Sequence, residues 1–203
     1  MGLTPEGMLA RVATILPHLT RLPLDDMRGQ AVVVASPDVV AEALRALRDD
    51  AQLQMDFLAD LTAVDYLGRT PRYEVVYQLQ SITRHHRLRV KTCLDEPEPV
   101  VPTASGLWKS AQWAEREVFD MFGIAFAGHP DLRRILMYPE FQGHPLLKDY
   151  PVQKTQPLVE YRTEQEAGVP LDKLAPFRDD EGLAFGRMDF AGRTRAREDE
   201  DVS

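Results

Sequence analysis

The chain has 203 residues, of which 44% are hydrophobic and 28% charged, a balance typical of a globular protein with one principal domain. Its net charge of -8 argues against a nucleic-acid partner, and its single cysteine, Cys93, excludes an internal disulfide or a metal or iron–sulphur site built from several cysteines of this chain. Residues 1–17 lack the pattern of an export signal, and no apolar run approaches the roughly 18 residues of a membrane span, so we expect a cytosolic location.

The N-terminal part of the chain has the pattern of a helix, a strand and a second helix. Apolar residues at helical spacing predict an amphipathic helix from Pro5 to Pro17. The β-branched run from Ala31 to Ala35 predicts a strand, and Ser36-Pro37 suits the start of the next helix. That helix ends near Asp50 and presents one apolar stripe, made of Val40, Ala43, Leu44 and Leu47.

A pair of antiparallel strands is predicted next. Alternation of apolar and polar residues indicates a half-buried strand from Tyr73 to Gln80 and a hairpin partner around Val90. The turn between them holds His85 and His86, which we expect to be exposed. The apolar patch from Phe57 to Val64 has no clear period, so helix and strand both stay open there.

Proline and glycine mark the boundaries of the later elements. Prolines in residues 95–102 predict a connector, and the segment from Gly106 to Phe122 has the composition of a helix, with Gly123 at a left-handed C-cap. We expect residues 1–150 to form a single α+β domain, a small mixed or antiparallel sheet packed by helices. Residues 151–203 are expected to form an extended tail that docks onto a partner, with roughly the last ten residues mobile.

A carboxylate interrupts the apolar stripe of the predicted helix after the connector. On a helical wheel, Glu115 falls in the middle of a stripe made of Trp108, Ala111, Val118, Phe119 and Phe122. An unpaired buried carboxylate is costly, so its pKa should be raised or a cation should pair with it; Arg133, Arg134 and Lys148 are the candidates. The pattern favours an internal ion pair that fixes helix packing and leaves a role in proton transfer as the alternative.

The opposite side of this helix is polar except for one tryptophan. Trp113 and Glu117 lie there, and an exposed tryptophan beside charges is typical of an interface anchor. Arg116 and Asp120 have the spacing of an i,i+4 ion pair. We therefore expect a helix that packs on the core with one side and on a partner with the other.

Two histidines raise the possibility of a metal site. His129 and His144 each lie between glycine and proline, with Asp131 and Asp149 nearby, but their spacing fits no compact ligand pattern. The flanking residues favour turns in which the histidines hydrogen-bond to the backbone. Phosphate-binding glycine loops and a serine nucleophile motif are both missing, so we expect no active site in this chain alone.

Five stretches of the chain resemble a known family. EREVFDMFGIAFAGHPDLRRILM from Glu115 and GHPLLKDYP ending at Pro151 resemble the signature of the thirty-kilodalton subunit of proton-translocating NADH:quinone oxidoreductase, respiratory complex I. DLTAVDY from Asp60, YEVVYQL from Tyr73 and HHRLRVK from His85 support it in the order of that family. One departure is Leu147, where relatives commonly have a basic residue.

The resemblance implies a scaffold subunit that carries no cofactor. Such a subunit lies in the peripheral arm on the cytoplasmic face of the bacterial inner membrane and meets the membrane only through the complex. Its implied partners are the large hydrogenase-like subunit of the quinone site and neighbouring Fe–S subunits, which pass electrons from NADH to quinone coupled to proton translocation. We expect structural or interface roles for Trp113, Glu115, Arg116, Glu117, Asp120, His129, Asp131, Arg133, Arg134, His144, Lys148 and Asp149.

Three other interpretations remain open from the sequence. The chain could be the equivalent subunit of a related membrane-bound hydrogenase or of a complex with another electron donor. It could be a small metal-dependent enzyme that uses His129, Asp131, His144 and Asp149, which predicts stoichiometric metal in the purified chain. It could also be a free-standing adaptor, which predicts a stable monomer without an obligate partner.

Overall fold

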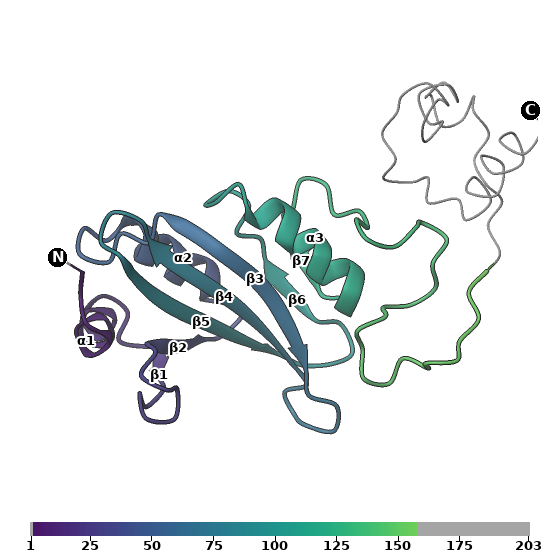
Figure 1. Ribbon diagram of the computed structural model, residues 1–203, viewed down its shortest axis with the longest axis horizontal. Helices are drawn as coiled ribbons and strands as arrows, with labels where there is room; N and C mark the ends of the chain where they lie inside the picture. Colours follow the sequence, from purple (N-terminus) through teal and green to yellow (C-terminus); the bar gives the residue numbers. More distant parts are fainter. Residues whose placement is uncertain (1, 158–203) are drawn as a thin grey trace, which may run out of the picture. The chain divides into compact units, whose positions relative to one another are not determined.

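A mixed sheet forms the centre of the fold (Figure 1). The computed structural model describes residues 2–157, which belong to one folded unit. The main sheet has the order β1-β2-β5-β4-β3, in which the strands are β1 (Thr20–Arg21), β2 (Val32–Ala35), β3 (Phe57–Asp65), β4 (Tyr73–Ser81) and β5 (His86–Leu94). Strands β2 and β5 are parallel and the other neighbours antiparallel, which confirms the predicted α+β class.

Helices share one apolar core with one face of this sheet. They are α1 (Pro5–Ile15), α2 (Val40–Asp49) and α3 (Ala111–Phe122). Val12, Leu44 and Val118, one from each helix, join Val75 and Tyr77 of β4 in a single buried cluster. In Figure 1, α2 lies behind the sheet and α3 lies next to β3. The stripe predicted for α2 is buried in full, which confirms the helix expected from the periodicity.

Helix starts differ from the prediction at two places. Helix α2 begins at Val40, after a turn in which the carbonyl of Ser36 accepts hydrogen bonds from the N–H groups of Val39 and Val40. Helix α3 begins at Ala111 and not at Gly106, since residues 105–110 form turns. A helical composition alone does not separate such turns from the helix that follows them.

Three other expectations are settled by the strands. The segment with no clear period is β3, an edge strand of the sheet. The expected connector contains β6 (Val100–Pro102), which pairs in parallel with β7 (Ala125–Ala127). The expectation that His86 is exposed was wrong. Its Nδ1 accepts from the Leu3 N–H at 3.1 Å and its Nε2 lies 2.6 Å from the Leu53 carbonyl, because β5 begins there and turns this side chain inward.

Residues 128–157, the segment after β7, contain no regular helix or strand. Of the tail predicted over residues 151–203, only residues 151–157 are described, and the expectations for the remainder lie outside the described residues. Within residues 2–157, no helix is long and apolar enough to span a bilayer.

Candidate functional site

Helix α3 and the segment after it meet at a glycine. Gly123 has φ 76°, the left-handed conformation predicted for the C-cap, and its N–H donates to the Phe119 carbonyl. A Cβ atom at this position would lie 2.7 Å from Cδ2 of His144, so the site requires glycine for space as well as for conformation. His144 is held there by a 3.0 Å contact between its Nδ1 and the Asp120 carbonyl.

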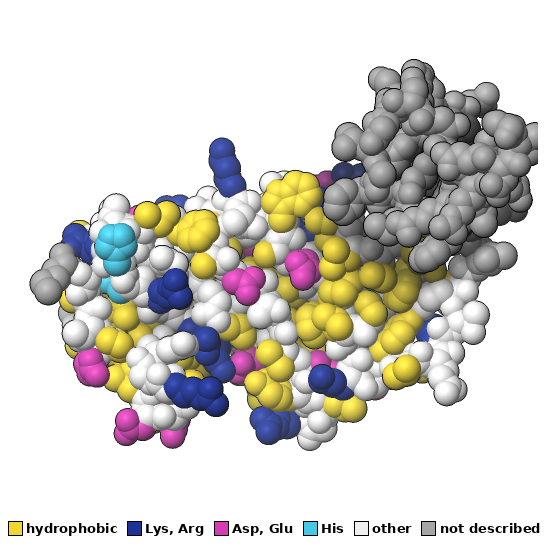
Figure 2. All heavy atoms as spheres, in the orientation of Figure 1, with side chains coloured by type: hydrophobic (Ala, Val, Ile, Leu, Met, Phe, Trp, Pro, Cys, Tyr) yellow, Lys and Arg dark blue, Asp and Glu magenta, His cyan; other side chains and the backbone are white. Residues whose placement is uncertain are grey.

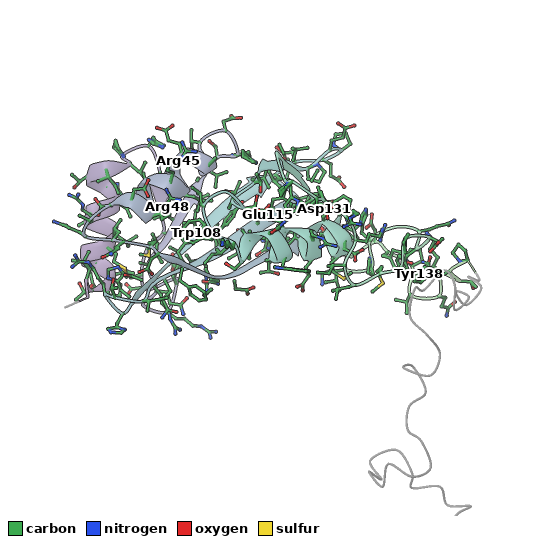
Figure 3. All side chains as sticks on the ribbon, turned by 90° about the horizontal axis from the view of Figure 1, so that it is seen from above. Arg45, Arg48, Trp108, Glu115, Asp131 and Tyr138 are labelled. Carbon is green, nitrogen blue, oxygen red and sulfur yellow. The ribbon has the colours of Figure 1, made fainter. Side chains whose placement is uncertain are left out.

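Glu115 is completely buried on the inner side of α3 (Figure 3). Its Oε1 accepts the Ala104 N–H at 2.6 Å and its Oε2 accepts the Thr103 hydroxyl at 2.5 Å. Burial raises the pKa of Glu115, and the two hydrogen bonds partly oppose that rise. The predicted burial and raised pKa agree with the structure.

The cations expected beside Glu115 bind elsewhere. Arg133 pairs with Asp131 at 2.6 Å and Arg134 pairs with Asp120 at 2.9 Å. The expectation of an Arg133, Arg134 or Lys148 partner was therefore wrong. Neutral donors from residues 103 and 104 bind the carboxyl instead, and Nε2 of His129 lies 3.9 Å from its Oε2.

Asp120 is the anchor of the segment that follows β7. Its buried Oδ2 accepts the backbone N–H groups of Ile135, Leu136 and Met137 at 3.0, 2.8 and 2.8 Å, and Oδ1 accepts from Arg134. Burial acts to raise the pKa of Asp120, but these donors outweigh it and hold the pKa below its ordinary value. One carboxylate thus fixes a stretch of chain that lacks secondary structure.

Arg116 and His129 fasten the near end of the same segment to α3. The i,i+4 pair expected between Arg116 and Asp120 was wrong, since Arg116 donates to the carbonyls of Arg133 and Arg134 at 3.0 and 3.2 Å. His129 accepts the Asp131 N–H on Nδ1 and places Nε2 3.1 Å from the Gln112 carbonyl. The predicted backbone-bonding role of both histidines is confirmed.

The far end of the segment is tied to the β3–β4 hairpin by an ionic cluster. Arg72, whose side chain is 8% exposed, donates to Asp65 at 2.7 and 2.8 Å, to Asp149 at 2.8 Å and to Glu96. The backbone N–H of Lys148 adds a bond to Asp65 at 2.8 Å. Hydrogen bonds from Arg72 hold the pKa values of Asp65 and Asp149 below their ordinary range.

Sequence reasoning missed Arg72 and Asp65 as site residues. The available signal was a carboxylate at the end of a strand followed by an arginine across a short turn, a spacing too common to single out. Lys148 contributes its backbone, and Leu147, where a basic residue was expected in relatives, packs against the core.

Exposed apolar side chains gather on α3 and the segment after it. Trp113 is 61% exposed and Glu117 lies near it, as predicted. Arg116 covers one face of the Trp113 ring at 5.4 Å. Further exposed hydrophobic side chains in the segment are Ile135, Leu136, Tyr138, Leu146 and Val152. Figure 2 shows hydrophobic side chains concentrated on the part of this face that holds α3 and the adjoining chain. Such a concentration is typical of an interaction surface.

The proposed metal ligands are not brought together. Within residues 2–157, no group of three or more His, Cys, Asp or Glu side chains could hold a metal ion. His129 and His144 contact the backbone at different places, Asp131 pairs with Arg133, and Asp149 pairs with Arg72. The structure therefore gives the metal-enzyme interpretation no support.

Comparison with known proteins gives a consistent result. The family described as "Respiratory-chain NADH dehydrogenase, 30 Kd subunit" matches residues 33–156. A protein from Roseiflexus sp. (strain RS-1), named as the C subunit of NADH-quinone oxidoreductase, is 47% identical over 152 residues, which cover 75% of this chain and 87% of the relative. A protein of the same name from Citrifermentans bemidjiense is 51% identical over 128 residues, covering 63% and 78%.

Solved structures with the same fold include a trypsin-resistant fragment of Nqo5. That fragment is 33% identical, with a TM-score of 0.55 over 63% of this chain and 98% of its own length. A chain from an archaeal membrane-bound sulfane sulfur reductase has a TM-score of 0.63 over 79% of this chain and 96% of its own. At 22% identity, this second likeness concerns the fold alone.

Proposed function

The chain belongs to the family of the 30 Kd subunit of respiratory-chain NADH dehydrogenase, and on that premise we propose that it is a scaffold subunit of the peripheral arm of NADH:quinone oxidoreductase. It docks the quinone-reducing module, so that electrons from NADH reach quinone through Fe–S clusters of other subunits with coupled proton translocation. It binds no cofactor and contributes by assembly, at the cytoplasmic face of the bacterial inner membrane.

The observation that carries this proposal is the way the segment after β7 is held. Buried Asp120 fixes its middle, the Arg72 cluster fixes its end, and on this segment the side chains of Leu136 and Leu146 remain 57% and 51% exposed. A chain without secondary structure is costly to order, and apolar side chains on it gain nothing from facing water. Both features are accounted for when the segment, together with Trp113, is a preformed docking surface.

The partner best suited to this surface is the large hydrogenase-like subunit of the quinone site, with Fe–S subunits adjacent. This choice rests on the family and not on a contact within the described chain. We extend it to the domain arrangement, in which residues 1–150 form the rigid base and residues 151–203 add a second docking element. Electron transfer and quinone access depend on fixed geometry between subunits, so a displaced scaffold lowers activity without touching a cofactor.

Affinity purification from native membranes in mild detergent tests the proposal. A tagged copy of the chain should recover NADH:quinone reductase activity together with the large hydrogenase-like subunit, identified by mass spectrometry. Recovery of the chain alone, as a monomer or with bound metal, would contradict the scaffold role.

The same purification separates the nearest alternative. Recovery of a hydrogenase-like subunit with hydrogenase activity, or with activity toward another donor, would assign the chain to a sister complex. A paired variant, Arg133→Ala with Arg134→Ala, should lower quinone reductase activity in the purified complex, because Arg134 helps to hold the segment through Asp120 and the Gly143 carbonyl. Normal activity in that variant would count against a role of these two arginines in aligning the partner subunits.

A further inference from the structure

A groove runs between the edge strand β3, helix α3 and the segment after β7. It encloses about 240 Å³, and its apolar lining comes from Leu58, Leu61, Trp113, Ala114, Ile135 and Leu136. Trp113 and Leu136 are more than half exposed at its rim. More than half of each of these two side chains is exposed, so the groove offers apolar area to an occupant from outside.

No strand of the described chain pairs with the outer edge of β3, although the Ser110 hydroxyl donates to the Leu58 carbonyl at 3.0 Å. Strand β3 is the last strand of the sheet, and among residues 2–157 it pairs with β4 only. Its pairing is irregular between Leu58 and Asp60 and regular from Asp60 to Asp65. Its sequence, FLADLTAVD, contains none of the lysine or proline residues that commonly protect an edge from further pairing. Such an edge can accept an additional strand through backbone hydrogen bonds.

The charges around the groove select the kind of occupant. Asp60 and Glu117 both line it, both are exposed, and neither makes an ion pair within the described chain. A second copy of this protein, with its net charge of -8, would bring further negative charge to this site. Residues 158–203 of the chain itself also contain more acidic than basic residues. A net negative charge of this kind opposes binding to the two carboxylates.

We propose that this groove binds an extended segment of a partner subunit that combines apolar side chains with lysine or arginine, and that the segment adds to the outer edge of β3 from Asp60 onward. The inference rests on the proposed function and specifies the chemistry of one contact in it. Backbone pairing with β3 provides general affinity, while Trp113 and the two carboxylates provide selectivity.

Photo-crosslinking in the assembled complex tests this inference. A benzophenone side chain is introduced at Ala59, which is exposed on β3, in the tagged full chain. The control position is Thr20, which is exposed on β1 at the opposite edge of the sheet. After irradiation of native membranes and purification, the crosslinked peptide is sequenced by mass spectrometry. The expected product from Ala59 is a partner peptide containing both apolar and basic residues, with no such product from Thr20.

Charge reversal provides the matched variant. Asp60→Lys with Glu117→Lys should lower the crosslinking yield from Ala59 by about tenfold, because each change replaces attraction by repulsion. Asp26→Lys with Glu98→Lys makes the same change in net charge at exposed positions outside the groove and should leave the yield within about twofold.

The outcomes separate this inference from the function on which it rests. A product with an acidic segment, with residues 158–203 or with a second copy of the chain would overturn the inference, as would equal products from both positions. Co-purification of partner subunits without a product at Ala59 would overturn it and leave the scaffold role standing. Failure of any partner to co-purify would overturn both.

Discussion

Arg72 and Asp149 lie 77 positions apart in the sequence, and Nη2 of Arg72 donates to Oδ1 of Asp149 at 2.8 Å. The same guanidinium binds Asp65, whose side chain is fully buried. This contact returns the end of the segment after β7 to the β3–β4 hairpin. The docking surface is therefore held at two places by buried ionic groups, by Asp120 in the middle of the segment and by Arg72 at its end.

Removal of Arg72 should destabilise the folded chain strongly. Arg72→Ala leaves the buried carboxylate of Asp65 without its cation, and we expect the free energy of unfolding to fall by roughly 3 kcal/mol or more. Urea denaturation measures the change. Arg48→Ala, which removes an exposed pair with Asp49, is the control and should have little measurable effect. A similar fall in the unfolding free energy of both variants would show that the Arg72 cluster stabilises the fold no more than an exposed ion pair does.

Acid should weaken the fold through Asp65 and Asp120. The pKa of each carboxyl is lowered in the folded chain, so at acidic pH the unfolded chain binds more protons than the folded one. Their stabilisation is present at neutral pH and should be lost progressively as the pH falls from roughly 5. Asp120→Asn, compared by urea denaturation across this range, should show a shallower dependence on pH. An unchanged slope would contradict the role assigned to its carboxylate.

Gly123 and Gly68 distinguish two reasons for keeping a glycine. Both have positive φ, 76° and 82°, but a Cβ atom would meet His144 at Gly123 and nothing within 4 Å at Gly68. Gly68→Ala should cost roughly 1 kcal/mol of unfolding free energy for the backbone conformation alone. Gly123→Ala should cost more, because His144 must also move. Equal thermal or urea stability of the two variants would contradict the close approach of His144 to Gly123.

Two tryptophans should respond in opposite ways. Trp108 is buried and donates Nε1–H to the Met55 carbonyl at 3.2 Å, so Trp108→Ala should lower the unfolding free energy by about 3–5 kcal/mol. Trp113→Ala should change it by no more than about 0.5 kcal/mol, yet weaken recovery of partner subunits. Urea denaturation and quantitative co-purification provide the two readouts. Full recovery of partner subunits with Trp113→Ala would show that this side chain does not contribute to the interface.

Local patterns were sufficient to predict the elements that depend on neighbours in sequence. The buried stripe of α2, the alternation of β4 and the left-handed conformation of Gly123 follow from periodicity and residue type. The exposed position of Trp113 likewise follows from helical geometry. Of the five stretches that carry the family resemblance, two lie in α3 and the chain after it, and three lie in or beside β3, β4 and β5.

Long-range pairings could not be predicted in the same way. The parallel pairing of β2 with β5 and the bond from Arg72 to Asp149 join residues that are far apart in the sequence. The periodicity of a local stretch does not indicate such long-range partners. The partner of Glu115 was misjudged because neutral donors in a preceding turn were available and nearer than any cation. His86 was misjudged because the strand begins one residue earlier than its turn suggested.

Quinone reductase activity in membranes lacking this chain tests the scaffold role most directly. The chromosomal copy is deleted and either the unaltered chain or an empty vector is returned, and NADH:quinone reductase activity and the membrane content of the hydrogenase-like large subunit are measured together. The scaffold role predicts that activity and large subunit are lost together without the chain and restored together with it. Full activity in membranes that contain no copy of the chain would contradict it.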